Sequence, residues 1–319
     1  MRTGHATAPA TESYAARHRG SDRTGFYRLA QGLTVSSLGI GTYLGGKGDD
    51  TDRRYEDAIA HAANSGINFI DTSLNYRQTR SERNIGRSIA NMPREELIVC
   101  TKAGYLIQGA TPPLEPGDIV GGNHSIAPSF LRDQIRRSRT NLDLETVDVL
   151  YLHNPETQLS HIRHEEFEAR LTMAFEALEQ MRTEGVIRFY GAATWDGFRK
   201  PGLLSLSRML SIARTVGGDG HGFRFIQLPL NLAMREGFVN SVTTEAEASG
   251  ITVVTSASIL QSRLVPAGVQ FAIQFARSTP GVAVSLVGMS RREHVHENLG
   301  VATVPPLTRE EYLAVLEKL

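Results

Sequence analysis

The segment Gly39-Ile40-Gly41-Thr42-Tyr43-Leu44-Gly45-Gly46 decides between two α/β folds for this chain. Short apolar runs alternate with helical patterns along the chain, which is the arrangement of βα units on a buried parallel sheet. A doubly wound nucleotide-binding sheet requires Gly-x-Gly-x-x-Gly directly after its first strand. Here Leu44 occupies the position of the third glycine. The segment therefore favours a closed barrel.

Eight apolar runs are predicted to form strands, and eight amphipathic segments are predicted to form helices between them. The predicted strands are Leu38–Tyr43, Phe69–Ser73, Ile98–Ala103, Val147–His153, Phe189–Trp195, Phe225–Asn231, Ile251–Ser256 and Val282–Gly288. The predicted helices are 52–65, 81–91, 128–142, 165–185, 200–215, 240–249, 267–278 and 291–299. Eight βα units in about 270 residues match a (β/α)₈ TIM barrel in number and length.

The residues before the first strand indicate two further features. The segment Phe26–Val35 is predicted to be a β-hairpin with Gln31-Gly32 as its turn, and it would plug the N-terminal mouth of the barrel. Residues 1–25 have little apolar content and are expected to be a mobile N-terminal tail. Residues 26–319 are then expected to form a single barrel domain. The long irregular stretch Tyr105–Ala127 is expected to lie on the catalytic face, because it follows a barrel strand.

Composition narrows the class of partner. The chain has 319 residues and no net charge, so nothing in it favours nucleic acid or an anionic membrane. No apolar stretch reaches the roughly 20 residues that cross a bilayer. Cys100 is the only cysteine, which excludes an internal disulfide and fits a reducing compartment. We expect a cytoplasmic protein with a small-molecule substrate. The sequence does not indicate an oligomeric state.

Ionisable side chains stand at the ends of three consecutive predicted strands, where barrel enzymes carry their catalytic groups. They are Asp71, Tyr76, Lys102 and His153. A buried lysine is rare unless it is paired, and Asp71 on the adjacent strand is the obvious partner. The ammonium is expected to lower the pKa of Tyr76 from about 10, so that the phenol releases its proton more readily.

Together the four residues indicate a general-acid site for reducing a carbonyl group, although each alone is compatible with a structural role. Tyr76 would protonate the substrate oxygen, His153 would orient the substrate, and a nicotinamide would supply the hydride.

These residues belong to stretches that resemble the aldo-keto reductase family. The stretches are Phe69–Tyr76, Ser81–Gly86, Cys100-Thr101-Lys102 and Leu152-His153, and the resemblance extends over roughly residues 30–300. It implies that Asp71, Tyr76, Lys102 and His153 form a catalytic tetrad. It also implies that NADPH binds across the barrel mouth without a Rossmann fold, and that no metal takes part.

The resemblance also implies a cofactor site. Gln227 matches the family's glutamine at the nicotinamide carboxamide. Three further residues match the motif around the adenosine: Ser290, Glu297 and Asn298.

Several positions depart from the family pattern in the cofactor site. Thr194, preceded by Ala193, stands where Ser-Asn often follows the glycine of strand five. Ser256 takes the place of the aromatic residue that stacks on the nicotinamide. His294 replaces an arginine that commonly faces the 2′-phosphate of NADPH. Arginines lie nearby and are expected to bind that phosphate: Arg263, Arg291 and Arg292.

The remaining candidates concern the substrate and two weaker motifs. Trp195 and Tyr43 end predicted strands and are expected to line the substrate site. Tyr43 and Lys47 also match the Tyr-x-x-x-Lys pair of another reductase class, but the glycine-rich nucleotide loop of that class is absent. Two histidine pairs are interpreted as surface histidines, because the pair 294/296 alternates on a predicted helix and the pair 161/164 lacks a clear third ligand, so no metal is expected.

The most direct hypothesis is an NADP-dependent aldo-keto reductase that converts an aldehyde or ketone to an alcohol. Two alternatives remain open. One is a redox-neutral epimerase, dehydratase or lyase on the same barrel. The other is a non-catalytic nucleotide-binding subunit.

Overall fold

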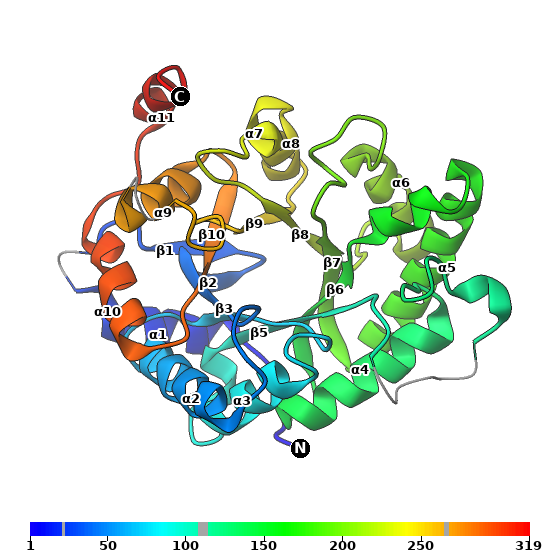
Figure 1. Ribbon diagram of the computed structural model, residues 1–319, viewed down its shortest axis with the longest axis horizontal. Coiled ribbons are helices and arrows are strands. Elements are labelled where there is room, and N and C mark those ends of the chain that lie inside the picture. Colours follow the sequence, from blue (N-terminus) through cyan, green and yellow to red (C-terminus); the bar gives the residue numbers. More distant parts are fainter. Residues whose placement is uncertain (21–22, 108–113, 265–267) are drawn as a thin grey trace.

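The computed structural model describes residues 1–20, 23–107, 114–264 and 268–319. Eight parallel strands close into a barrel in the order β10-β3-β4-β5-β6-β7-β8-β9 (Figure 1). The strands are β3 (Leu38–Gly41), β4 (Phe69–Asp71), β5 (Ile98–Ala103), β6 (Val147–His153), β7 (Ile187–Ala193), β8 (Phe223–Pro229), β9 (Thr252–Ser256) and β10 (Val282–Gly288). Each overlaps a predicted strand, and the predicted barrel is confirmed.

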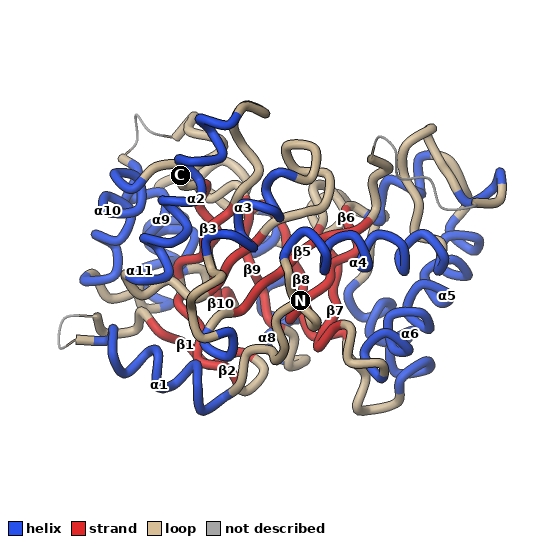
Figure 2. Tube along the Cα trace, turned by 90° about the horizontal axis from the view of Figure 1, so that it is seen from below, coloured by secondary structure: helices blue, strands red, loops and turns tan. Residues whose placement is uncertain are grey.

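Helices cover the outside of the barrel on all sides (Figures 1 and 2). They are α2 (Asp49–Asn64), α3 (Arg80–Ser88), α4 (Pro128–Leu142), α5 (His164–Thr183), α6 (Leu206–Gly217), α7 (Glu236–Val239), α8 (Val242–Ala248), α9 (Val269–Ser278), α10 (Arg292–Leu299) and α11 (Arg309–Leu316). Their apolar residues recur at helical spacing and face the sheet, as Tyr55, Ile59 and Ala62 do in α2. No helix in the described ranges is both long and apolar enough to cross a membrane.

A β-hairpin closes the N-terminal end of the barrel, as predicted. Strands β1 (Tyr27–Ala30) and β2 (Leu33–Ser36) pair antiparallel. Gln31 and Gly32 between them have φ of 51° and 75°, which a two-residue turn of this hand requires. Leu33 and Val35 are buried in one cluster with Phe69 and other side chains of the barrel interior, so the hairpin plugs the barrel.

The N-terminal segment differs from the mobile tail expected over residues 1–25. Residues Ala8–Arg19 form helix α1, which lies with β1 and β2 at one end of the barrel (Figure 2). Tyr14 is buried, and the backbone N–H of Ala6 donates to Asp148 Oδ1 of β6 at 2.8 Å. The sequence did not predict this helix, because only a few of its residues are buried and its apolar content is low. Residues 21–22 lie outside the described residues.

Candidate active site

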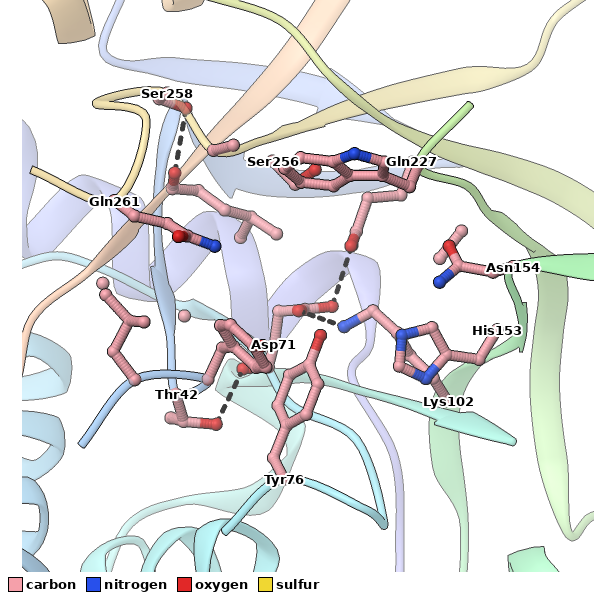
Figure 3. Close-up of a pocket in the computed structure, with 18 of the residues that line it drawn as sticks. Thr42, Asp71, Tyr76, Lys102, His153, Asn154, Gln227, Ser256, Ser258 and Gln261 are labelled. Atoms are coloured by element: carbon pink, nitrogen blue, oxygen red, sulfur yellow. Dashed lines mark hydrogen bonds and ion pairs between the residues drawn. The ribbon is translucent and has the colours of Figure 1, made fainter. Parts of the chain in front are cut away.

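A cavity of about 450 Å³ opens at the C-terminal ends of the barrel strands (Figure 3). Side chains from both sides of the barrel mouth line it. They include Thr42, Tyr43, Asp71, Asn75, Tyr76, Lys102, Tyr105, His153, Asn154, Thr194, Trp195, Gln227, Ser256, Ser258 and Gln261. The four residues predicted to do chemistry therefore meet in one cavity.

The base of the cavity holds a buried ion pair. Lys102 Nζ donates to Asp71 Oδ1, and also to the carbonyl oxygen of Thr72 at 2.7 Å. Asp71 Oδ2 accepts a hydrogen bond from Gln227 Nε2 at 2.9 Å. Burial raises the pKa of Asp71, and the ammonium of Lys102 opposes this. Burial lowers the pKa of Lys102, but Asp71 and Tyr76 outweigh it and the net direction is upward. The lysine therefore stays charged.

Tyr76 lies beside this ion pair and keeps part of its surface open to the cavity. Lys102 Nζ is 5.0 Å from the centre of its ring. Burial raises the pKa of Tyr76, while Lys102 lowers it. The expected influence of the lysine is present, but the expected net lowering is wrong, because enclosure of the phenol outweighs it. Tyr76 thus keeps its proton at neutral pH, which is the state that a general acid needs.

His153 faces Tyr76 edge to face, with ring centres 5.7 Å apart. Its Nδ1 lies 3.1 Å from Ser73 Oγ. Burial lowers the pKa of His153 far below its usual range, and Lys102 and His124 add to the shift. The imidazole is therefore neutral, and it can hydrogen-bond a substrate oxygen only as a neutral donor.

Two residues that the sequence did not single out support His153. His124 Nε2 donates to the backbone oxygen of His153 at 2.8 Å, and His124 Nδ1 accepts from Gln158 Nε2 at 2.8 Å. Tyr105 packs edge-on against both imidazoles, with ring centres 5.0 Å away in each case. Tyr105 and His124 both belong to the stretch Tyr105–Ala127, so part of that loop reaches the site. Pro112 and Pro113 of the same stretch lie outside the described residues.

The predicted cofactor residues fall into two groups. Thr194, Gln227 and Ser256 line the cavity, as do the predicted substrate residues Tyr43 and Trp195. The others do not line it: Arg263, Ser290, Arg291, Arg292, His294, Glu297 and Asn298. Most of these lie in or next to α10, which begins four residues after the cavity residue Gly288.

The side chains of that second group are mostly exposed. Arg291 and His294 face solvent, whereas Asn298 is buried. Arg292 Nη1 lies 3.4 Å from Asp57 Oδ1 of α2. Across the part of the chain that the structure describes, no group of three His, Cys, Asp or Glu side chains is placed to hold a metal ion.

A parallel (β/α)₈ barrel with an ionisable cluster at its C-terminal mouth defines a broad class of barrel proteins. Within it, this chain belongs to the aldo/keto reductase family, whose model matches residues 37–201.

Curated relatives match the chain over part of its length. It is 33% identical to a D-threo-aldose 1-dehydrogenase of Pseudomonas over 178 residues, which is 51% of each protein. It is 28% identical to an NADH-specific methylglyoxal reductase of Escherichia coli over 175 residues, 51% of this chain and 50% of that relative. These matches span about half the length of the two relatives.

Solved structures share the fold over most of the chain. A glycerol dehydrogenase from Gluconobacter oxydans superposes with a TM-score of 0.69 at 21% identity, covering 92% of this chain and 95% of that one. An aldo/keto reductase from Klebsiella pneumoniae in complex with NADP and acetate gives 0.66 at 19% identity, covering 93% and 95%.

Proposed function

We propose that this protein is an NADPH-dependent oxidoreductase that reduces the carbonyl group of an aldehyde or ketone to an alcohol. The observation that carries the proposal is the buried pair Lys102–Asp71 beside the phenol of Tyr76, at the base of a cavity. Burying a charged pair costs solvation free energy. Here the pair lies beside Tyr76, where it acts on a proton donor that faces the cavity. Its substrate would be a small molecule that enters this cavity, and the free thiol of Cys100 is compatible with action in the reducing cytoplasm.

In this proposal each polar residue has a separate task. Asp71 holds Lys102 in place and keeps it charged. Lys102 stabilises the phenolate that Tyr76 becomes when it gives its proton to the substrate oxygen. Neutral His153 orients that oxygen by hydrogen bond. The proton donor and the orienting group are fixed by the fold before the substrate arrives, which is how preorganised sites lower a barrier.

The residues at the mouth fit a nicotinamide nucleotide. The cavity extends from Lys102 to Gln227 and Ser256, so a flat polar ring has room beside the tetrad. Thr194, Gln227 and Ser256 would hold the nicotinamide end. The adenosine end would be held by Arg263, Ser290, Arg291, Arg292, His294, Glu297 and Asn298. When bound, the nicotinamide supplies the hydride.

The 2′-phosphate of NADPH would find exposed arginines next to the start of α10, and guanidinium groups match phosphate oxygens. A solved aldo-keto reductase from Klebsiella pneumoniae contains NADPH, whereas the Escherichia coli relative is described as NADH-specific. Both cofactors therefore need to be tested on this protein.

The test is Tyr76→Phe, which removes only the phenolic proton. We expect it to fold normally and to lose roughly 10²- to 10⁴-fold in kcat/KM for carbonyl reduction. Tyr27→Phe is the matched control, because it removes a phenol at the opposite end of the barrel. Wild-type kcat/KM in Tyr76→Phe would refute the assignment of Tyr76 as the acid.

A second function is favoured by one feature of the cavity. Ala193 and Ser256 line it and offer no aromatic face to a nicotinamide, which suits a redox-neutral epimerase, dehydratase or lyase using Tyr76 and Lys102. Fluorescence titration with NADPH and with NADH, followed by turnover assays, separates the cases. Turnover without net consumption of the nucleotide supports the second function, and binding without any turnover supports a non-catalytic subunit.

A further inference from the structure

Glu156 makes an unusual set of contacts next to the cavity. It lies in the short helix η3 (Pro155–Ser160), three residues after His153, and it is 7% exposed. Its Oε1 accepts three consecutive backbone N–H groups of the loop after β7. The donors are Trp195 at 2.8 Å, Asp196 at 2.9 Å and Gly197 at 3.1 Å.

Successive backbone N–H groups in a turn form a concave site that attracts an anion. In this chain the anion is the carboxylate of Glu156, supplied by the neighbouring strand-end loop. Hydrogen bonds to an ionised acceptor are about twice as strong as neutral ones. Burial raises the pKa of Glu156, and the backbone N–H groups oppose that rise.

The loop held in this way carries Trp195. The indole lines the cavity but is 41% exposed, so side-chain packing alone does not enclose it. A backbone hydrogen bond at the start of this loop adds to the restraint, since Asn154 N donates to the carbonyl oxygen of Ala193, the last residue of β7, at 2.6 Å. Trp195 therefore has an exposed side chain at the mouth of the cavity, while its backbone is held by the hydrogen bond to Glu156.

The second carboxylate oxygen of Glu156 argues against a simple structural cap. Oε2 is buried and has no hydrogen-bond partner among the described residues. A buried acceptor without a partner is destabilising. A serine could cap one N–H without that penalty, but it would not hold three N–H groups with a full negative charge.

We propose that Glu156 is a positioning residue that fixes Trp195 as a rigid wall of the substrate cavity and so determines which substrates are accepted. This rests on the proposed function insofar as the cavity is taken as the substrate site. Glu156 does not touch the reacting atoms. It acts on binding, so loosening it weakens the binding of substrates that contact the indole and leaves the chemical step of a bound substrate nearly unchanged.

Trp195 is the only tryptophan of the chain, so tryptophan fluorescence of the whole protein reports on this loop alone. The main variant is Glu156→Gln, which keeps the volume and an acceptor oxygen but removes the charge. Asp196→Asn is the matched control, since it removes a charge from the same loop, where the carboxylate contacts Arg199 and Lys200.

We expect folded Glu156→Gln to show faster local motion of Trp195 in time-resolved anisotropy and stronger acrylamide quenching than both wild type and Asp196→Asn. On a bulky carbonyl substrate we expect KM to rise roughly three- to tenfold, with kcat changed less than about twofold. Unchanged anisotropy and quenching would overturn the proposal. A mobile Trp195 with unchanged KM would overturn its specificity part.

Two further measurements keep the test decisive. If Glu156→Gln does not fold, anisotropy of wild type still decides, because a freely rotating Trp195 in the native protein contradicts a rigid wall. If no carbonyl reduction is found for wild type, the proposed function fails, whereas the fluorescence comparison needs no substrate and still tests whether Glu156 fixes Trp195.

Discussion

The two sides of the cavity are built in opposite ways. On the side of β4, β5 and β6, Asp71, Lys102 and His153 are at most 8% exposed, and each has hydrogen-bond partners within the protein. On the other side, where the chain leaves β9, the lining residues Gln261 and Ser262 are exposed, and beyond them Arg263 and Arg291 face solvent. One side is buried and internally paired, and the other is open and polar.

This difference separates chemistry from binding. Groups that move a proton must be held in one geometry before the substrate arrives, and burial strengthens their mutual electrostatic effects. Groups that bind a phosphate do not need this, because the anion itself orders them and the start of a helix already favours negative charge. Substitutions on the buried side should therefore have large effects, and those on the open side should have small, ligand-specific ones.

Removal of the lysine charge tests the buried side most directly. Lys102→Met should lose at least about 10²-fold in kcat/KM, because nothing then stabilises the phenolate of Tyr76. The alkaline limb of the residual pH–rate profile should move to higher pH, since burial and Asp71 then raise the pKa of Tyr76 without the opposing effect of Lys102. Lys318→Met, at the chain end, is the control. A profile with its original limb would contradict the coupling.

The same variant leaves Asp71 buried without its partner, which is expected to cost about 3–5 kcal/mol of stability. A double variant, Asp71→Asn with Lys102→Met, should recover much of that stability without recovering activity. Urea unfolding beside steady-state kinetics would show this. If the double variant were active, the ion pair would be structural and not catalytic.

The pH dependence of stability tests the role of His124, which hydrogen-bonds the backbone of His153. Its pKa is about 4 in the folded chain because it is buried, against about 6.5 when unfolded. As pH falls below 6.5, the unfolded state takes up this proton before the folded state does. The free energy of unfolding therefore decreases by about 3 kcal/mol between pH 6.5 and about pH 4. His124→Gln should lack this loss in urea unfolding compared at pH 7 and pH 4. The exposed His164→Gln should retain it, and an equal loss in both variants would assign it to other groups.

The parts of the buried side that follow from the sequence are those set by strand periodicity. In the register of the parallel strands, Asp71 of β4 lies opposite Cys100 of β5, and Lys102 of β5 lies opposite Tyr151 of β6. Alternation along each strand then points Asp71, Lys102 and His153 into the mouth of the barrel, and Tyr76 follows in the loop after β4. This is why the strands and these three residues were predictable, whereas the hairpin plug was predicted from its Gln31-Gly32 turn and Tyr76 from its place in the loop after a strand.

The residues that the sequence did not reveal act through contacts between loops. His124 reaches the backbone of His153, and Glu156 reaches that of Trp195, across chain separations with no fixed period. Helix α1 was not predicted, because its few buried residues, such as Tyr14, do not form a long amphipathic pattern. The net pKa direction of Tyr76 depends on how fully the phenol is enclosed, which only the packed structure shows.

The open side should show the smallest effect, and it should distinguish the two cofactors. Arg292 is exposed and lies 3.4 Å from Asp57, a pair worth about 0–1 kcal/mol. Arg292→Ala should therefore leave stability unchanged and raise the Kd for NADPH roughly three- to tenfold, while the Kd for NADH stays within about twofold, because only the 2′-phosphate needs the guanidinium. Asp57→Asn is the informative control, since it frees Arg292 and should bind NADPH at least as tightly as wild type. Added salt should weaken NADPH binding more than NADH binding. Equal Kd values for the two cofactors in wild type, or an equal loss of both in Arg292→Ala, would show that the arginines next to the start of α10 do not form a 2′-phosphate site.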